Sequence, residues 1–252
     1  MSNASLQHTT LAGHRALIIG ANGGIGSAIA HALGTAGADL VLAARDGDRL
    51  EQLHAALAAA GMNSHVVPTD VTDDDAVQAL VEQAAGFDIA VNNAGTAHRP
   101  TPLGELPIDE ADRVLQTTLR GVLVAMHHEL AALPDGGCIV NIASTAGLSG
   151  APGMGAYVAA KHAVIGLTRT AALDYAHRGI RVNAVAPGSI DSGRISAQPD
   201  ETRRLIAGTA PLGRLGHPDE VAAAVAWLVS PASSYTTGTV LTVDGGKGAR
   251  GA

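Results

Sequence analysis

The sequence predicts an α/β fold, in which one doubly wound domain holds a parallel sheet of seven strands with helices on both faces. First, seven short apolar runs alternate with longer stretches of helical periodicity. Second, these runs are apolar almost throughout, which is typical of strands buried on both faces. Third, no Pro- or Ser-rich linker and no block of like charges interrupts the chain, so we expect a single domain over residues 1–252.

Each of the first three strands is followed closely by a helix. We expect these strands at 15–20, 38–44 and 65–70. Apolar residues recur at helical spacing over 26–37, and that stretch stops at a Gly, as helices commonly do. A second helix is expected at 48–61. The third begins in an acidic cluster at 73–75, where carboxylates suit the positive end of the helix dipole.

The second half of the chain repeats this alternation with longer helices. We expect its strands at 88–95, 138–144, 180–188 and 239–246. Helical stretches at 107–132 and 155–177 follow the first two of these strands, and a helix at 218–229 precedes the last. The segment 189–217 is interrupted by Gly and Pro and shows no regular period. It is too long for a mere connector, so we expect a substrate loop or lid there.

Composition and charge exclude several classes of protein. Lys and Arg number 16 against 23 Asp and Glu, a net charge of −7, so nucleic acid is not an expected partner. No apolar run reaches the roughly 18–20 residues of a membrane helix, so we expect no membrane partner. The start of the chain lacks the pattern of a signal peptide. We therefore expect residues 1–11 to form a flexible lead and the protein to be cytoplasmic.

Cysteine and histidine usage gives no sign of a disulfide framework or a metal site. Cys138 is the single cysteine, and its place at the start of a buried-looking strand predicts core packing. His127 and His128 are adjacent, so they point to different faces of their helix. No second ligand pair with metal spacing is visible, and we expect both histidines at the helix surface or an interface.

The first strand runs directly into the glycine-rich stretch GANGGIG at 20–26, and a helix follows. Glycine permits a tight turn and a close approach of the backbone to a pyrophosphate, while the helix N-terminus supplies N–H donors. The context predicts a Rossmann-type dinucleotide site, and a plain tight turn is the alternative. The residues expected to bind the cofactor here are Gly20, Asn22, Gly23, Gly24, Ile25 and Gly26.

The end of the second strand indicates which dinucleotide is bound. An NAD enzyme typically carries an acid there to hold the ribose hydroxyls, but this chain has Ala44 followed by Arg45. A guanidinium can pair with a 2′-phosphate, so NADP(H) is expected rather than NAD(H). Asp46 lies near the spacing of the missing acid, and we interpret it as the cap of the next helix. A solvated surface charge is the alternative for Arg45.

Tyr157 and Lys161 are four residues apart in a predicted helix, so both lie on one helix face. A phenol has a reference pKa of about 10, and a nearby ammonium lowers that pKa by favouring the phenolate. Ser144 ends the preceding strand, and its hydroxyl can hydrogen-bond a carbonyl oxygen. Tyr–Lys pairs at this spacing are common on solvated helices, but the Ser at the strand end makes the arrangement specific.

These features and four more occur in the order and spacing of the short-chain dehydrogenase/reductase family, which the chain resembles from about residue 12 to residue 246. The four further matches are Asp70 after the third strand, NNAG at 92–95, the Pro187-Gly188 turn and the terminal VDGG.

The resemblance implies a role for each matched position. Tyr157 would be the general acid/base, Lys161 would bond the nicotinamide ribose and lower the pKa of Tyr157, and Ser144 would orient the carbonyl. The adenosine half of the cofactor would lie against Asp70, Val71, Asn92, Ala94 and Gly95. The nicotinamide half would lie against Pro187, Gly188, Ile190 and Ser192. A helix or turn cap is the alternative for Asp70, and an ordinary strand-end turn for NNAG.

Three positions depart from the family pattern. Ile19 stands where a Thr commonly ties the first strand to NNAG, and Ser192 keeps the hydroxyl of a usual Thr. Thr118 stands at the position of the catalytic Asn that usually holds a water at the Lys end of the proton relay. The shorter Thr side chain can bond back to a carbonyl of its own helix, so we expect a less ordered relay.

We therefore expect an NADPH-dependent oxidoreductase that interconverts a carbonyl and a secondary alcohol by hydride transfer, with a small molecule as substrate. The alternatives are an NAD-linked alcohol dehydrogenase and a non-catalytic dinucleotide-binding sensor, which only Thr118 favours. An acyl-carrier-protein ketoacyl reductase would need a basic docking patch, to which Arg120 and Arg169 could contribute. The family implies a homotetramer, or a dimer, with the helices at 107–132 and 155–177 packing between subunits.

Overall fold

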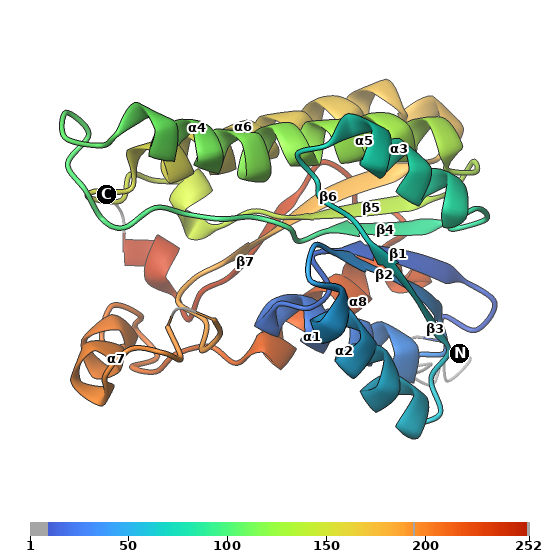
Figure 1. Ribbon diagram of the computed structural model, residues 1–252, viewed down its shortest axis with the longest axis horizontal. Coiled ribbons are helices and arrows are strands. Elements are labelled where there is room, and N and C mark those ends of the chain that lie inside the picture. Colours follow the sequence, from blue (N-terminus) through green and yellow to red (C-terminus); the bar gives the residue numbers. More distant parts are fainter. Residues whose placement is uncertain (1–9, 194, 251–252) are drawn as a thin grey trace, which may run out of the picture.

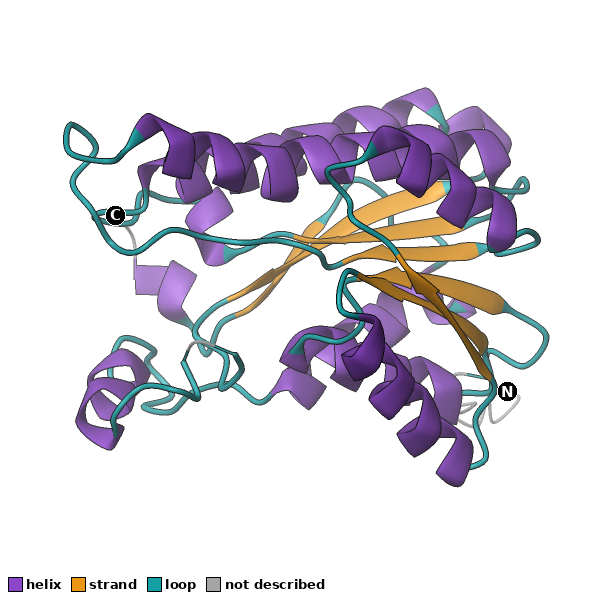
Figure 2. Cartoon of the chain, in the orientation of Figure 1, coloured by secondary structure: helices purple, strands orange, loops and turns teal. Residues whose placement is uncertain are grey.

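The computed structural model describes residues 10–193 and 195–250, and all its named strands form one parallel sheet (Figures 1 and 2). The spatial order is β3-β2-β1-β4-β5-β6-β7, which confirms the predicted seven-stranded doubly wound sheet. The strands are β1 (Arg15–Ile19), β2 (Asp39–Ala44), β3 (Ser64–Pro68), β4 (Ile89–Asn92), β5 (Cys138–Ile142), β6 (Arg181–Pro187) and β7 (Val240–Val243).

Helices cover both faces of the sheet, as Figure 1 shows. One face carries α3 (Asp74–Gln83), α4 (Ile108–Leu115), α5 (Gly121–Ala132) and α6 (Gly155–Asp174). The other carries α1 (Gly24–Thr35), α2 (Gly47–Ala59) and α8 (Pro218–Val229). Each face has its own apolar core, built from Ala, Val, Leu and Ile, and Phe87 is the chain's single phenylalanine. Two cores of small side chains bring the helices close to the sheet.

The strand order reverses between β1 and β4, because the chain winds outward from β1 in one direction and from β4 in the other. These two strands pair with Ile19 opposite Asn92, so the turns that follow them lie side by side. Ligands of open α/β sheets bind in the crevice at the carboxyl ends of the strands at such a point. The fold therefore places residues 20–26 and 93–97 along one crevice.

Three segments differ from the expectations. The helix expected over 107–132 is interrupted by a π-helical turn, Gln116–Arg120, between α4 and α5. The segment 189–217 is not irregular throughout, because it contains α7 (Asp200–Ala207). Within the expected lead, Leu11 is fully buried, because its side chain joins the core beneath α1. Residues 1–9 of that lead lie outside the described residues.

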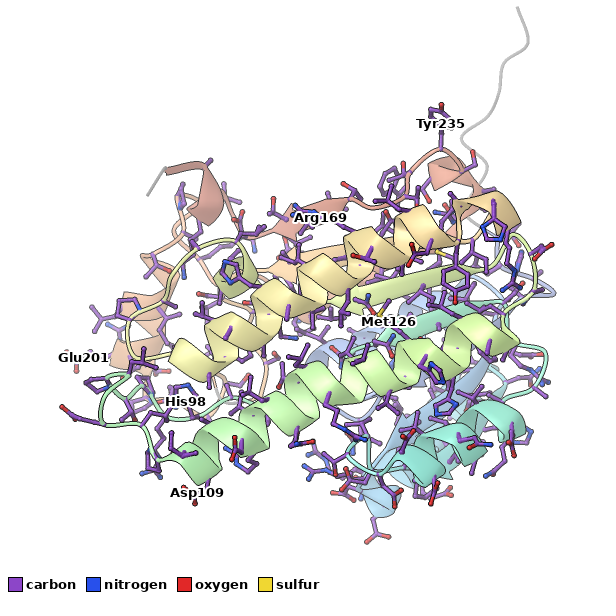
Figure 3. The ribbon with its side chains drawn as sticks, turned by 90° about the horizontal axis from the view of Figure 1, so that it is seen from above. His98, Asp109, Met126, Arg169, Glu201 and Tyr235 are labelled. Carbon is purple, nitrogen blue, oxygen red and sulfur yellow. The ribbon has the colours of Figure 1, made fainter. Side chains whose placement is uncertain are left out.

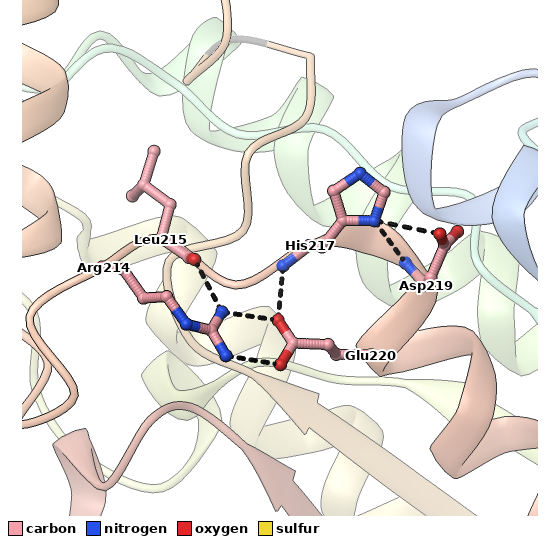
Figure 4. A network of polar contacts seen from close by, with 5 residues as sticks. All are labelled: Arg214, Leu215, His217, Asp219 and Glu220. Carbon is pink, nitrogen blue, oxygen red and sulfur yellow. Dashed lines mark hydrogen bonds and ion pairs between the residues drawn. The ribbon is translucent and has the colours of Figure 1, made fainter.

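The segment 189–217 is fixed at both of its ends. At its start the Asp191 carboxylate pairs with Arg203 at 2.5 Å, which ties it to α7. At its end Arg214 donates two hydrogen bonds of 2.8 Å to Glu220 at the start of α8 (Figure 4). The Arg214 bonds hold the pKa of Glu220 down at about 2, and His217 caps the same helix. A backbone bridge between Ile190 and Gly216 closes the segment into a flap.

Cys138 and the adjacent histidines are structural in this fold. Cys138 is buried against α8, and burial raises the pKa of its thiol to about 11, which confirms core packing. His128 donates a 2.9 Å hydrogen bond from Nε2 to the carboxylate of Asp74, which joins α5 to α3 within the chain. His127 lies at the surface beside it, with the two ring centroids 5.0 Å apart.

Candidate active site

Two adjoining cavities occupy the crevice at the carboxyl ends of the strands. The first measures about 540 Å³ and lies at the ends of β1, β2 and β3. The second measures about 480 Å³ and lies between β5, β6 and α6. Asn93 and Gly95 line both, so the two cavities meet at the end of β4. A long ligand with two distinct halves, such as a dinucleotide, matches this pair of joined hollows.

Close packing alone requires glycine at several positions of this turn. Gly20 has a φ of +85°, and a Cβ there would lie 2.5 Å from the backbone nitrogen of Ala94. A Cβ on Gly26 would lie 2.1 Å from the carbonyl oxygen of Gly20. A Cβ on Gly24 would lie 2.7 Å from the Cβ of Ser192, on the far side of the crevice. The turn therefore touches both walls of the site, and side chains larger than hydrogen would push them apart.

The N-terminus of α1 opens into this crevice and fits a phosphate group. Its N-cap is Gly23, which offers no side chain to the first N–H groups, and its first turn holds no acidic residue. Gly20, Asn22 and Gly23 line the first cavity, and Ile25 lines the second. Uncapped N–H groups and the positive end of a helix dipole favour an anion at this position.

The far end of the first cavity is basic. Arg45 lines it as predicted, and so does Arg49, which the sequence analysis missed. The Asp46 side chain accepts a 3.1 Å bond from the backbone N–H of Arg49, which confirms it as the cap of α2. Within residues 10–193 and 195–250 neither guanidinium forms an ion pair with a carboxylate. The four-residue spacing of the two arginines was the signal that could have identified Arg49.

Asp70 and Val71 follow β3 at the edge of the first cavity. Val71 lines the cavity, whereas Asp70 accepts bonds of 2.9 and 2.8 Å from the N–H and hydroxyl of Thr72. The backbone bond from Thr72 is the main cause of the lowered pKa of the Asp70 carboxyl. Asp70 thus caps a turn, which is the alternative that the sequence offered for it. Its contact with an adenine remains a prediction. Thr69 and Thr117 are further lining residues that the sequence did not single out.

The second cavity brings together Ser144, Tyr157 and Lys161, the predicted catalytic side chains. Its wall also contains the predicted nicotinamide-side residues Pro187, Gly188, Ile190 and Ser192. Other lining residues were not predicted, namely Thr96, Ala97, Ile142, Ala143, Gly193 and Ile195. Residues as far apart in the sequence as Ile25 and Ile195 thus line one hollow.

Lys161 is almost fully buried beneath Tyr157. Its ammonium donates a 2.6 Å bond to the carbonyl oxygen of Ile142, at the end of β5, and lies 5.8 Å from the centroid of the Tyr157 ring. Burial lowers the pKa of Lys161 to about 8, because the charged form loses hydration. The Ser144 oxygen accepts a 3.1 Å bond from the N–H of Ala146, which leaves its hydroxyl hydrogen to donate to a ligand.

Asn92 does not line either cavity, contrary to the expectation for NNAG. Its side chain is buried between β4 and the helices, where it donates to Glu129 and to Asn141. Asn93 takes its place at the site: its amide donates a 2.8 Å bond to the carbonyl oxygen of Gly20. Its backbone N–H donates to the carbonyl oxygen of Ile19, so β1 and the NNAG segment are joined without a hydroxyl at position 19. Successive strand residues face opposite sides of the sheet, which explains the exchange.

Thr118 does not bond back to its own helix, so that expectation is wrong. Its hydroxyl donates a 2.7 Å bond to the carbonyl oxygen of Thr96 and accepts a 2.9 Å bond from the N–H of the same residue. Arg113 adds a 2.9 Å bond to the Thr96 hydroxyl. The π-helical turn presents Thr118 toward the end of β4. Thr118 therefore holds in place the segment that separates the two cavities.

Residues 10–193 and 195–250 contain no group of three or more His, Cys, Asp or Glu placed to hold a metal ion. None of their helices has the length and apolar character needed to cross a bilayer.

Comparisons with known proteins give one consistent family. A family profile described as enoyl-(acyl carrier protein) reductase matches residues 20–247. Cis-4-hydroxycyclohexanecarboxylate dehydrogenase of Sinomonas cyclohexanicum is 42% identical over 92% of this chain and 95% of its own length. A-factor type gamma-butyrolactone 1′-reductase (1S-forming) of Streptomyces virginiae is 40% identical over 92% of this chain and 94% of its own.

A solved structure with bound cofactor has the same fold. It is an Agrobacterium tumefaciens protein, described as a candidate 2-deoxy-D-gluconate 3-dehydrogenase, with bound NADP. Its TM-score to this chain is 0.88 at 36% sequence identity, and the match covers 96% of this chain and 99% of that one.

Gly26→Ala tests whether close packing fixes the glycine-rich turn. The new methyl would lie 2.1 Å from the Gly20 oxygen, a backbone atom that cannot move aside alone. We expect the free energy of unfolding in urea to fall by about 1–3 kcal/mol or more, as for overpacked cores. Gly104→Ala is the matched control, since nothing lies within 4 Å of its Cβ position, and we expect it to change stability by less than about 0.5 kcal/mol. Equal stability of the two variants would contradict this account.

Thr118→Val tests the hydrogen-bonded clamp on Thr96. Valine keeps the shape but removes both bonds, which leaves the Thr96 N–H and carbonyl without their partner. We expect a loss of about 1–3 kcal/mol in the free energy of unfolding. Thr118→Ser retains the hydroxyl and loses one methyl, worth about 0.8 kcal/mol. Equal free energies of unfolding for the Thr118→Val and Thr118→Ser variants would contradict the clamp.

Proposed function

The chain belongs to the short-chain dehydrogenase/reductase family of oxidoreductases, and we propose that it interconverts a ketone and a secondary alcohol with NADP(H) as cofactor. The observation that supports this most directly is the second cavity. There Ser144, Tyr157 and Lys161 share one hollow with the end of the dinucleotide crevice. A substrate oxygen in this hollow would lie beside a proton donor and next to the cofactor's expected nicotinamide position.

NADP(H), when bound, supplies or accepts the hydride at the carbinol carbon. Tyr157 gives a proton to the substrate oxygen during reduction and takes it back during oxidation. The buried Lys161 ammonium stabilises the phenolate between these steps, because its charge lies within 5.8 Å of the ring in a low-dielectric environment. Ser144 donates its hydroxyl hydrogen to the same substrate oxygen and so fixes the orientation of the carbonyl.

The preference for NADP(H) is supported by the two arginines of the first cavity. Arg45 lies just before α2 and Arg49 in its first turn, and both line the first cavity, where they could clamp a 2′-phosphate from two sides. Asp46, the carboxylate between them, also lines the first cavity, but its Oδ1 is engaged in capping α2. This engagement favours NADP(H) over the NAD-linked alternative, and the NADP-bound structural neighbour agrees with the choice.

The substrate is proposed to be a small, largely apolar molecule with the secondary alcohol on or beside a ring. The substrate side of the second cavity is lined by Ala97, Ile190 and Ile195, whose side chains offer apolar contact. The names of the two relatives describe a ring-bearing alcohol acid and a butyrolactone. An acyl-carrier substrate gains little support, because Arg120 of the required patch is already engaged with Asp74 and Thr72.

We further propose a homotetramer, with a dimer as the alternative, assembled through the outer faces of α5 and α6. Leu123 and Leu173 are exposed there, at 48% and 80% of their surface. A groove of about 230 Å³ runs between the two helices. A cytoplasmic location also remains a prediction.

Arg45→Ala tests whether Arg45 recognises the 2′-phosphate of NADP(H). Removing a charged contact to the 2′-phosphate should weaken NADPH binding by about 10- to 150-fold, equivalent to about 1.5–3 kcal/mol, and leave NADH binding nearly unchanged. Arg49→Ala should act in the same direction. Dissociation constants from nucleotide fluorescence measure both, and Arg169→Ala, an exposed arginine outside both cavities, controls for the loss of one charge. Stronger binding of NADH than NADPH by the unaltered protein would overturn the preference.

Tyr157→Phe tests the general acid/base. Phe keeps the ring and removes the proton-transfer group, so kcat should fall by about 10²–10⁴-fold while the dissociation constant of NADPH stays the same. Lys161→Met should impair both turnover and cofactor binding, since the ammonium is expected to serve the phenol and the ribose. Steady-state kinetics on cyclic ketones, together with binding titrations, separate the two effects. A Tyr157→Phe variant with a near-normal rate would remove Tyr157 from this role.

A further inference from the structure

Glu129 is a fully buried carboxyl in the core between α5 and the sheet, away from both cavities. One of its oxygens, Oε2, accepts a 2.9 Å bond from the Asn92 amide. The other, Oε1, has no hydrogen-bond partner among the described residues, and neither has the Asn92 oxygen Oδ1. Two buried oxygens, one on each of two side chains already joined by a hydrogen bond, thus lack a donor. Burying unpaired acceptors costs free energy unless a hydrogen lies between them.

A chain of hydrogen bonds starts at this pair and runs in one direction. The Asn92 amide also donates to Asn141 at 3.0 Å, and the Asn141 amide donates to the Thr168 hydroxyl at 2.9 Å. Thr168 then donates to the carbonyl oxygen of Val164 at 2.8 Å. The Sδ of Met126, which Figure 3 labels on α5 beside α6, accepts a second 3.4 Å bond from Asn141. These hydrogen bonds link α5, β4, β5 and α6 in turn.

We propose that Glu129 is a neutral carboxylic acid in the folded protein and that its Oε1 hydroxyl donates to Oδ1 of Asn92. The acid and the amide then form a two-bond pair, in which each group donates once and accepts once. No covalent bond changes except the O–H bond of the carboxyl: between about pH 4.5 and pH 7, folding takes up one proton from the solvent at Glu129. The proposal supplies the missing donor at the head of the chain and satisfies both orphaned oxygens together.

Among the residues that the structure describes, no charged group lies close enough to Glu129 to favour its ionised form. The groups that reach the pair from β4, β5 and α6 are Asn92, Asn141 and Thr168, all uncharged. On α5 the preceding His128 is turned toward Asp74 of α3. Burial raises the pKa of Glu129 to about 7, and only the Asn92 bond opposes that shift. A carboxyl with these neighbours keeps its proton at a pH where surface carboxyls have lost theirs.

Because this series of hydrogen bonds runs beneath the site, Glu129 is a positioning residue for it. Asn92 immediately precedes Asn93, which bonds Gly20 and lines both cavities. At the other end, Val164 lies one turn after Lys161 on α6. Ionisation of Glu129 would remove the donor at the head of the chain and place a charge beneath the end of β4. This effect on the site rests on the proposed function, whereas the protonation of Glu129 does not.

Infrared spectroscopy of the protein without cofactor tests the protonation directly. At pH 6 surface carboxyls, with pKa values near 4, are ionised. We expect a carbonyl band of a protonated carboxylic acid at that pH, which fades as the pH rises through about 7. The band should be absent from Glu129→Gln and present in Glu82→Gln, a control at an exposed carboxyl on α3. A wild-type spectrum without this band at pH 6 overturns the proposal. This measurement is made on the unaltered protein, so it does not depend on whether a variant folds.

Unfolding in urea as a function of pH provides an independent measure. The folded-state pKa of Glu129 lies above its unfolded value, so its stabilising contribution is complete below about pH 4.5 and is lost as the pH rises to about 7. Gln makes the same two bonds without titrating. Relative to Glu129→Gln, the wild type should therefore become less stable over this range, by on the order of 10²-fold in the unfolding equilibrium constant. Parallel pH curves for the two proteins contradict the proposal, as does a Gln variant that fails to fold.

NADPH binding separates this inference from the proposed function. The dissociation constant of the wild type should rise several-fold between pH 6 and pH 8.5, and that of Glu129→Gln should rise less. Identical pH dependence in the two proteins would overturn the positioning role. Absence of NADPH binding at every pH, with the infrared band present, would instead refute the proposed function and leave the protonated Glu129 established.

Discussion

The structure of the site depends on the contact between the two turns that follow β1 and β4. The backbone of Gly20 approaches Ala94 so closely that a Cβ would lie 2.5 Å from its nitrogen. The Asn93 amide bonds the Gly20 oxygen at 2.8 Å and seals this contact. Because β1 and β4 are neighbours at the point where the strand order reverses, the contact forms the floor of the crevice. Both cavities open from that floor and share Asn93 and Gly95 as their common wall.

Polar groups beneath the crevice keep this wall in place. Thr118 holds the backbone of Thr96 through both its N–H and its carbonyl, and does so from a π-helical turn that breaks the regular spacing between α4 and α5. π-Helical turns inside α-helices are frequent at functional sites, because they re-aim one side chain. On the same face of the sheet, Asn92 begins the buried series of hydrogen bonds toward α6. The residues between the anchored positions 92 and 96 are therefore fixed at both ends.

The chemistry of the second cavity follows from burial without a counter-charge. Lys161 has its ammonium bonded to a backbone carbonyl, and burial lowers its pKa toward the working range. Such an ammonium gains most from an anionic neighbour, and in the proposed mechanism that neighbour is the Tyr157 phenolate. The composition of the chain assists this arrangement. With 31 Gly and 2% aromatic residues, the sheet and its helices pack closely, and the site is built on a rigid base.

The sequence by itself determined the parts of the protein that are set by local pattern. The apolar runs predicted all seven strands, the GANGGIG stretch predicted the turn into α1, and the spacing of Tyr157 and Lys161 predicted one shared helix face. Asp46 was recognised as a cap because N-capping is a property of neighbouring residues. These signals depend on residues within a few positions of one another.

The tertiary structure alone decided which groups meet across the sheet. Asn92 and Asn93 are adjacent in the sequence, yet strand alternation and the register with β5 turn the first into the core and the second into the crevice. The partner of Thr118 lies 22 residues earlier, and Glu129 meets an amide 37 residues away. Arg49 enters the first cavity only because α2 packs against β2 and β3. Pairings of this kind are fixed by packing between distant segments, and no local pattern of residues encodes them.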